Sequence, residues 1–213
     1  MRLVAISDTH GRHAELTLPE GDVLIHTGDF SRRGRVEELE DFNAWLGEQP
    51  FRHRIIIAGN HDWLFERDNA HARALITNAI YLEDSGCELA GLRFWGSPWT
   101  PVFFDWAFNL PRGEALAEVW RRAPAGVDVL LTHGPPKGIL DRTTRGVAAG
   151  CEALRDELPR IAPRVHIFGH IHEAAGRHEQ DGTVFLNASS LDARYQPAEA
   201  PVVIDLEPRP VTS

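Results

Sequence analysis

The chain has 213 residues, of which 43% are hydrophobic and 25% are charged, as is typical of a globular protein with a substantial core. Its formal net charge of −9 argues against a protein that coats duplex nucleic acid, because such a protein needs a basic face to displace counterions. No apolar run approaches the roughly 20 residues of a membrane-spanning helix, so no membrane partner is expected.

The two cysteines, Cys87 and Cys151, lie far apart in the sequence and belong to no C-x-x-C pattern. A disulfide framework or a thiolate zinc site is therefore not expected, and a reducing cytoplasm suits the chain best. The opening RLVAIS is shorter than the apolar core of a signal peptide, which agrees with a cytoplasmic location. Because the chain has no long linker or repeat, we predict a single domain over residues 1–213.

Short apolar runs recur along the chain, and each ends in polar residues, as a buried strand does where it enters a loop. In chain order these runs are LVAISDTH, DVLIHTGD, RIIIAGNH, VDVLLTHG and RVHIFGHIH. Helical patterns lie between them, in RVEELEDFNAWLGE, NAHARALITN, GEALAEVWRR and CEALRDELPR. The alternation predicts an α/β protein with helices on the faces of a sheet.

Three later segments depart from this alternation. CELAGLRFWG and GRHEQDGTVFLNAS each place glycine at a turn between two strand-like halves, which predicts hairpins. APVVIDL predicts a last strand. These segments favour a mixed α/β sandwich over a plain doubly wound sheet.

The polar residues at the ends of the apolar runs are mostly imidazoles and carboxylates. They are Asp8, His10, Asp29, Asn60, His61, His133, His170 and His172. Nitrogen and oxygen donors of this kind suit divalent transition metals such as Mn, Fe, Zn or Co. They are too many for one catalytic zinc and suit two metals about 3.5–4 Å apart that share a carboxylate. Beside them, Gly28, Gly59, Gly134 and Gly169 are expected to permit tight bends that aim the donors at one point.

Each motif alone has a purely structural explanation. Asp8 suits a turn in which its carboxylate caps a backbone amide, Asn60 suits a helix N-cap, and His133 before two prolines suits an ordinary loop. Five such motifs, each after an apolar strand, favour the metal site. Most of the remaining histidines are expected to be solvated or hydrogen-bonded, and His13 is kept as a candidate because it follows the first ligand loop. The remaining histidines are His13, His26, His53, His71, His166 and His178.

The motifs D-x-H, G-D, G-N-H-D, H-G and G-H-x-H, in this order, resemble those of the calcineurin-like metallophosphoesterase superfamily. Longer stretches such as HTGDFSRRG, THGPPKG and VHIFGHIHE resemble its metallophosphoesterase-domain-containing branch. The resemblance implies four layers, with a central β-sandwich of two mixed sheets flanked by helices. It implies one metal bound by Asp8, His10, Asp29 and His172, and a second bound by Asp29, Asn60, His133 and His170.

The resemblance also implies that His61 is catalytic and faces the substrate without binding metal. Asp62 stands where many members of the superfamily have glutamate, and we expect its carboxylate to orient the His61 imidazole. The implied reaction is hydrolysis of a small phosphate ester. Hydroxide formed between two metals would attack phosphorus in line, and His61 would protonate the leaving oxygen.

A phosphodiester is the favoured substrate, and a cyclic nucleotide is the favoured natural type. The alternatives are a slow or inactive regulatory protein that binds metal and nucleotide, a phosphomonoesterase, and a protein phosphatase. The acidic balance of the chain argues against a nuclease, and its oligomeric state is left open.

The segment GSPWTPVFFDWAFNLPRG carries five aromatic rings, at Trp99, Phe103, Phe104, Trp106 and Phe108. They suit a stacking surface for a nucleobase. For most of them we favour an apolar plug over the neighbouring hairpin, because large aromatic side chains are usually buried. One or two of the basic residues in loops after the ligand motifs are expected to contact phosphate. These candidates are Arg12, Arg32, Arg33, Lys137, Arg142 and Arg145.

Overall fold

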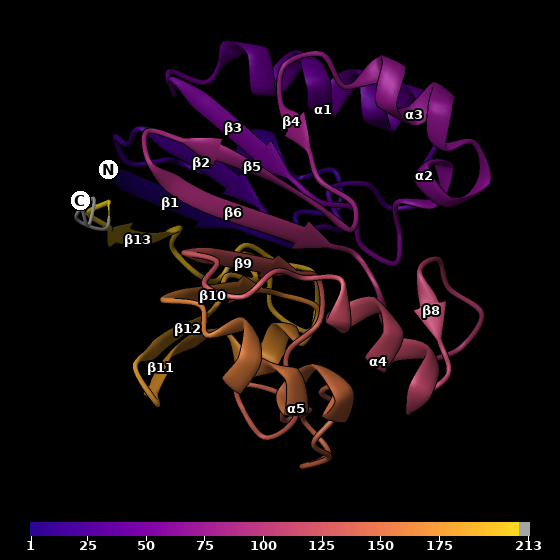
Figure 1. Ribbon diagram of the computed structural model, residues 1–213. Coiled ribbons are helices and arrows are strands. Elements are labelled where there is room, and N and C mark those ends of the chain that lie inside the picture. The colour runs from indigo at the N-terminus through magenta and orange to yellow at the C-terminus, as the bar shows by residue number, and fades with distance from the viewer. Residues whose placement is uncertain (209–213) are drawn as a thin grey trace.

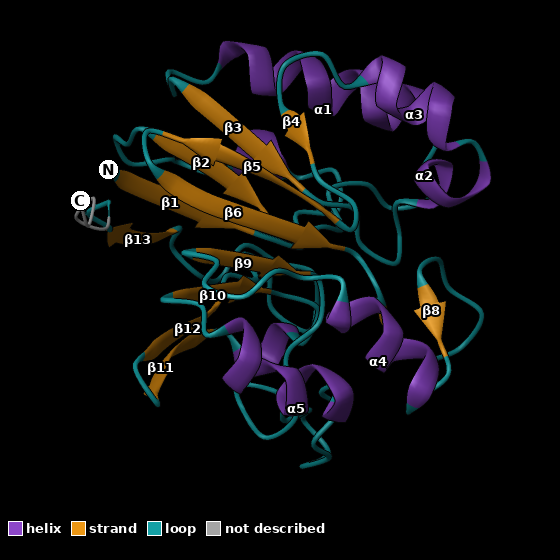
Figure 2. Ribbon diagram, viewed as in Figure 1, coloured by secondary structure: helices purple, strands orange, loops and turns teal. Residues whose placement is uncertain are grey.

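The computed structural model describes residues 1–208 and arranges them in four layers, with two sheets between two sets of helices (Figure 1). This is the predicted α/β class. The helices α1, α2 and α3 cover one sheet, and α4 and α5 cover the other (Figure 2). Their bounds are Val36–Glu48, Trp63–Arg67, Asn69–Leu75, Glu114–Arg121 and Glu152–Ile161 for α1 to α5. The helices within residues 1–208 are all too short or too polar to cross a bilayer.

The first sheet has five strands in the order β13-β1-β2-β3-β4. Strands β1 to β4 run parallel, and β13 pairs antiparallel with β1. The bounds are Arg2–Ile6 for β1, Val23–His26 for β2, His53–Ile56 for β3, Ile80–Tyr81 for β4 and Val202–Asp205 for β13. The predicted last strand is thus an edge strand beside the first one.

The second sheet has six strands in the order β11-β12-β10-β9-β6-β5. Both predicted hairpins lie at its edges, as β5 with β6 and β11 with β12. The four inner strands run parallel. The bounds are Ser85–Leu89 for β5, Leu92–Ser97 for β6, Val129–Thr132 for β9, Val165–Phe168 for β10, Gly176–Gln180 for β11 and Thr183–Asn187 for β12.

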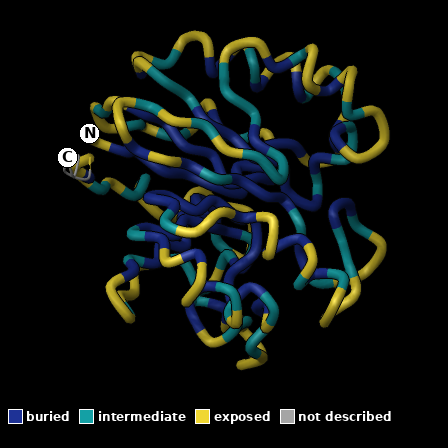
Figure 3. The backbone as a smooth tube through the Cα atoms, viewed as in Figure 1, coloured by how far each residue is buried: buried dark blue, intermediate teal, exposed yellow. Residues whose placement is uncertain are grey.

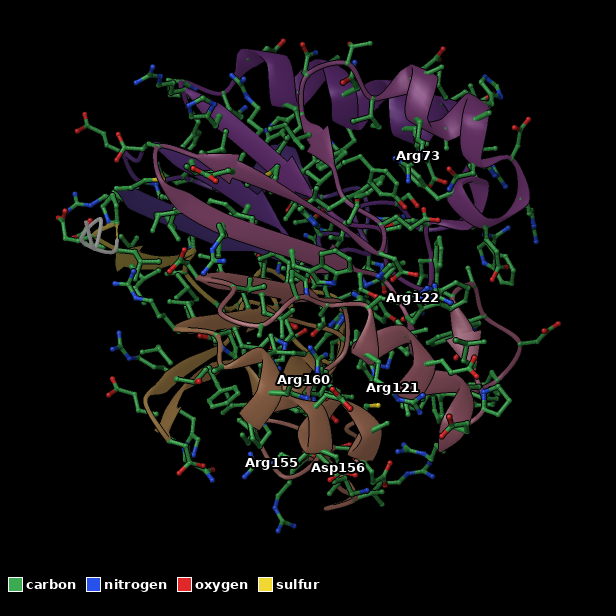
Figure 4. All side chains as sticks on the ribbon, in the orientation of Figure 1. Arg73, Arg121, Arg122, Arg155, Asp156 and Arg160 are labelled. Carbon is green, nitrogen blue, oxygen red and sulfur yellow. The ribbon has the colours of Figure 1, made fainter. Side chains whose placement is uncertain are left out.

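Successive residues of the central strands face two different apolar layers. In β1, Leu3 and Ala5 pack between the sheets, whereas Val4 and Ile6 pack under α1. Side chains alternate along a strand, so a strand covered on both faces is apolar throughout. The buried residues form the centre of the molecule in Figure 3, with exposed residues on the outer sides of the helices. In Figure 4, for example, Arg155 and Asp156 lie on the side of α5 that faces away from the sheets.

Several short elements were not predicted from the sequence. They are α2, β4, a two-stranded sheet of β7 (Thr100–Pro101) and β8 (Asn109–Leu110), and the 3-10 helices His13–Glu15 and His172–Ala174. Segments of two to five residues are too short to show a hydrophobic period. The cysteines are free thiols, as expected, with Cys151 buried and Cys87 partly buried.

Candidate metal centre

The seven predicted metal ligands converge where the carboxyl ends of the two sheets meet. The sheets are joined there by a parallel bridge between Ser7 and Ser189 and by a hydrogen bond from the Ser190 N–H to the Ser7 carbonyl. Asp8 and His10 follow β1, Asp29 follows β2, Asn60 follows β3, His133 follows β9, and His170 and His172 follow β10. Parallel strands present their carboxyl ends at one edge, so the loops of both sheets supply donors to one place.

The predicted ligands, more than the glycines beside them, adopt the unusual backbone conformation. Asp8, His10, Asp29 and His170 have φ between 44° and 69°, in the left-handed region. Non-glycine residues in this region are uncommon and cluster at functional sites. Of the four glycines predicted to permit bends, Gly28 has a left-handed φ of 99°, and the other three do not.

Gly59 and Gly169 are required for a different reason, namely close approach of the ligands. A Cβ atom on Gly59 would lie 2.3 Å from Asp29 Oδ1, and one on Gly169 would lie 2.1 Å from Asp8 Oδ2. Any side chain at these positions would displace a carboxylate. The predicted role of these two glycines in bending the chain is therefore wrong, and their role in admitting the ligands replaces it.

The first group of donors comprises Asp8, His10 and His172, whose ligand atoms lie within 4.8 Å of one another. The Nε2 atoms of His10 and His172 are 3.4 Å apart, and His172 Nε2 is 3.5 Å from Asp8 Oδ1. Asp8 Oδ2 accepts hydrogen bonds from the His170 N–H and the Ser189 hydroxyl, but the buried Oδ1 has no hydrogen-bond partner. An unpartnered carboxylate oxygen beside two imidazole nitrogens is what a divalent cation requires.

The second group comprises Asp29, His133 and His170, again with all ligand atoms within 4.8 Å. His133 Nε2 lies 3.5 Å from Asp29 Oδ2 and 2.8 Å from Asn60 Oδ1. Asn60 is almost completely buried, and its amide nitrogen has no partner within the described chain. Because its side-chain oxygen is the atom beside His133, Asn60 is placed as the predicted neutral ligand would be.

Two of the imidazoles are held so that Nε2 points into the centre. The Nδ1–H of His133 donates to the Thr27 carbonyl at 2.9 Å, and that of His172 donates to the Asp192 carbonyl at 3.0 Å. Metal-binding histidines usually donate their second N–H in this way, which fixes the tautomer and the ring orientation. Sequence reasoning did not identify either carbonyl, because a backbone acceptor leaves no residue-type signal.

Asp29 connects the two groups. Its Oδ2 lies 3.5 Å from His133 Nε2 in the second group and 3.8 Å from His10 Nε2 in the first. Its Oδ1 accepts a hydrogen bond from the His61 backbone N–H at 2.8 Å. This position, with one oxygen between both sets of imidazoles, suits a carboxylate shared by two cations.

The ionisation of the cluster also suits cations. Burial lowers the pKa of His133, but the Asp29 charge outweighs it and raises the pKa to about 9. Burial likewise lowers the pKa of His172, and contact with Asp8 raises it to about 9. His10 and His170, in contrast, have pKa values lowered to about 4 by burial. The Asp29 and Asp8 carboxylates thus each favour a positive charge nearby, which protonated His133 and His172 would supply. Divalent cations bound at the same places would replace these two protons.

His61 is partly exposed, and one of its ring nitrogens forms a third group of donors with His10 and Asp29, with all ligand atoms within 4.8 Å of one another. Its Nε2 is 4.0 Å from Asp29 Oδ2, and its Nδ1–H donates to the Arg32 carbonyl at 2.9 Å. The ring packs against His10, with ring centroids 4.8 Å apart, and against Trp106, with centroids 4.7 Å apart. The imidazole is therefore fixed in orientation, with Nε2 facing the donors.

The predicted contact between Asp62 and the His61 imidazole is wrong. The Asp62 carboxylate is buried and accepts hydrogen bonds from the backbone N–H groups of Asp29 and Gly59, each at 2.8 Å, and of Ser31 at 3.0 Å. It also accepts one from the Ser31 hydroxyl at 2.6 Å. Asp62 therefore ties the loop after β2 to the loop after β3, while a backbone carbonyl orients His61.

A family model described as calcineurin-like phosphoesterase matches residues 1–174. The chain belongs to this family. Metallophosphoesterase domain-containing protein 1 of Homo sapiens and that of Mus musculus are each 43% identical to it over 230 residues, covering 96% of this chain and 71% of the relative. These relatives support the branch that the sequence motifs indicate.

Among solved structures, the phosphopantetheinyl hydrolase PptH from Mycobacterium tuberculosis matches with a TM-score of 0.61 and 19% identity. The match covers 99% of this chain and 98% of that one. At this identity the likeness shows a common fold, and it agrees with the layered sandwich described above.

Two histidines outside the predicted metal centre are buried and hydrogen-bonded, as expected from the sequence. His26 and His166 are completely buried, and each is hydrogen-bonded to a threonine, at 3.0 Å to Thr9 and 2.8 Å to Thr132. Burial lowers the pKa of both to about 3, so both rings are neutral. His13 lies under α1, with Nε2 3.2 Å from an Asp41 carboxylate oxygen.

The aromatic segment is only partly the plug that we favoured. Phe108 is buried against Trp99, with ring centroids 5.4 Å apart, and these two rings fit the plug. Phe103, Phe104 and Trp106 instead line a pocket of about 650 Å³ that also reaches His10, Asp29 and His61. The plug is therefore wrong for these three, because the segment turns them away from the core.

Six basic residues were candidates for one or two phosphate contacts, and of these Arg145 lines the pocket. Two others support loops: Arg32 Nε donates to the His10 carbonyl at 2.8 Å, and Arg12 donates to the Tyr195 carbonyl. Arg112, which sequence reasoning did not single out, also lines the pocket and donates to the carbonyls of Ala149 and Gly150.

In Figure 4, Arg122 lies where the two halves of the sandwich meet, and its guanidinium is 2.9 Å from an Asp84 carboxylate oxygen.

Replacing Asp62 by alanine is expected to lower the free energy of unfolding by about 3 kcal/mol or more, because three buried N–H groups would lose their acceptor. Urea unfolding of the metal-loaded protein measures this effect. Asp156→Ala, which removes an exposed carboxylate on α5, is the control and should change stability little. An Asp62→Ala protein as stable as wild type but impaired in turnover would contradict the structural role.

Proposed function

We propose that the chain is a phosphoesterase that uses two divalent transition metals to hydrolyse small phosphodiesters, with a cyclic nucleotide as the favoured natural type. Membership of the calcineurin-like phosphoesterase family supports the hydrolase class. The observation that carries the proposal is the position of Asp29, whose Oδ2 lies 3.8 Å from His10 Nε2 in the first donor group and 3.5 Å from His133 Nε2 in the second. One cation would take Asp8, His10, Asp29 and His172, and the other would take Asp29, Asn60, His133 and His170.

Bound at these positions, two divalent cations would lower the pKa of water to near neutrality and neutralise charge on the phosphoryl oxygens. The remaining chemistry belongs to side chains of the chain. His61 is oriented through Nδ1 by the Arg32 carbonyl, and its Nε2 faces the donors. We assign to Nε2 the proton that the leaving oxygen receives when the ester bond breaks.

The charge balance favours a diester over a more highly charged substrate. A diester carries one negative charge, whereas a monoester near neutral pH carries up to two. Besides the proposed cations, the pocket offers two arginine side chains, Arg112 and Arg145, and the first of these is already paired with Glu152. The pocket volume of about 650 Å³ is sufficient for organic groups on both sides of a phosphate.

The test compares bis(p-nitrophenyl) phosphate, p-nitrophenyl phosphate, and the 2′,3′- and 3′,5′-cyclic nucleotides after metal reconstitution. We expect kcat/KM for the diester to exceed that for the monoester by about tenfold or more, and at least one cyclic nucleotide to be hydrolysed. Good monoesterase activity without hydrolysis of any cyclic nucleotide would contradict the diester assignment. Tight nucleotide binding without turnover would instead support the regulatory alternative. The cytoplasm remains the proposed compartment.

A further inference from the structure

Exposed apolar side chains gather around the pocket that is lined in part by four of the predicted metal ligands, His10, Asp29, His170 and His172. Six large hydrophobic side chains are exposed among the described residues: Val102, Phe103, Phe104, Val147, Tyr195 and Val203. All of them except Val203, which lies on β13, line this pocket. Single exposed apolar residues are ordinary, but a group of them in one depression marks a surface that binds an apolar partner.

The aromatic surface runs from the mouth of the pocket to His61 without a break. The rings of Phe103 and Phe104 have centroids 4.4 Å apart, and both lie within 6 Å of Trp106. Trp106 in turn packs on His61. A phosphodiester bound in this pocket would therefore place one of its two organic groups against these rings.

The backbone holds the two phenylalanines outward. The N–H of Phe103 donates to the Asn109 side chain at 3.1 Å, and the N–H of Val102 donates to the Leu110 carbonyl at 3.0 Å. Phe104 has a left-handed φ of 56°, an unfavourable conformation for a bulky residue, and its side chain is 72% exposed. The left-handed backbone lowers stability, and the exposed aromatic ring gains no stabilisation from burial. This combination is typical of a residue kept for binding.

The pocket lining is also apolar beside His10 and His172. The Tyr195 ring lies 4.9 Å from that of His10 and 5.3 Å from that of His172, measured between centroids. Val147, on the loop between β9 and α5, completes the lining and is 57% exposed. A phosphate at the predicted metal ligands would thus lie near these apolar side chains. Arg145 also lines the pocket and has no ion-pair partner among the described residues.

We propose that Phe103 and Phe104 are specificity-determining residues that bind an apolar substituent of the phosphodiester, aromatic or alkyl. The inference rests on the proposed function and deepens it, because it names the part of the substrate that the protein recognises. A nucleobase, an aryl group and an alkyl chain share this chemistry, and the experiment separates them.

The experiment uses four p-nitrophenyl phosphodiesters that share a leaving group and carry a methyl, hexyl, phenyl or thymidine 5′ group. In wild type, kcat/KM should be roughly tenfold or more higher for the phenyl or hexyl ester than for the methyl ester, mainly through KM. The double variant Phe103→Ala/Phe104→Ala should reduce this ratio by about tenfold. Phe103→Leu/Phe104→Leu should retain the ratio for the hexyl ester and lose part of it for the phenyl and thymidine esters, because leucine side chains are apolar but cannot stack.

Val203→Ala is the matched control, because it removes an exposed apolar side chain outside the pocket and should leave the ratio unchanged. Equal kcat/KM values for all four esters, or a ratio that the double variant does not change, would overturn the inference. A double variant with wild-type kinetics but a changed sedimentation coefficient would also overturn the inference, because this result would assign the rings to contact with a second copy of the chain.

A binding measurement distinguishes failure of this inference from failure of the proposed function. If none of the four esters is hydrolysed, the phosphodiesterase assignment fails. Calorimetric binding of diphenyl phosphate and dimethyl phosphate to the metal-loaded protein then tests the apolar surface without turnover. We expect diphenyl phosphate to bind roughly tenfold more tightly, and equal affinities would overturn the inference.

Discussion

Replacing His61 by alanine is expected to lower kcat for poor leaving groups by about 10²–10⁴-fold and to leave the metal content unchanged. The reason is its position: Nε2 faces the donors, but the ring is oriented by the Arg32 carbonyl and packs on Trp106. Steady-state kinetics and elemental analysis of the same preparation measure both quantities. His178→Ala, which removes an exposed histidine on β11, is the control.

The leaving group separates proton donation from other roles of His61. A p-nitrophenolate leaves without help, whereas the alkoxide released from a cyclic nucleotide needs a proton. The His61→Ala variant should therefore lose much less activity on bis(p-nitrophenyl) phosphate than on a cyclic nucleotide. Equal losses on both substrates would remove the proton-donor assignment, and loss of a metal would make His61 a ligand.

The second large effect concerns the metals. After reconstitution, elemental analysis should give close to two divalent metals per chain, and Asp29→Ala should reduce the binding of both, because Asp29 Oδ2 lies between the two groups. Activity should fall by more than about 100-fold, which is the upper range for residues that only support ligands. His172→Ala, in contrast, should weaken one metal and spare the other.

Asp205→Ala is the control for Asp29→Ala, because it removes an exposed carboxylate that pairs with Arg2 on the edge of the first sheet. Its metal content should equal that of wild type. A firm stoichiometry of one metal, with His133 or His170 not bound to it, would contradict the two-metal assignment. Full activity in a chelator-treated sample containing less than a tenth of the metal would contradict any metal role.

Local sequence was sufficient to nominate the metal ligands, because each follows a strand that its own residues specify. Asp8 follows LVAIS, and Asn60 follows RIIIAG. An apolar run ending in glycine and polar residues indicates where a strand ends, and the carboxyl ends of parallel strands share an edge. The roles of supporting residues were harder to predict. Asp62 contacts the backbone of Gly59 nearby, but its other partners are some thirty residues earlier in the chain.

By itself, therefore, the sequence determined the α/β class, the main strands and helices, and the motifs that supply the candidate ligands, since period and residue type are local properties. Tertiary structure alone decided which backbone positions take left-handed conformations and which glycines admit a carboxylate. It also decided that Phe103 and Phe104 line the pocket while Phe108 is buried. The physical reason is that burial depends on what packs against a side chain, and those neighbours come from strands and loops distant in the sequence.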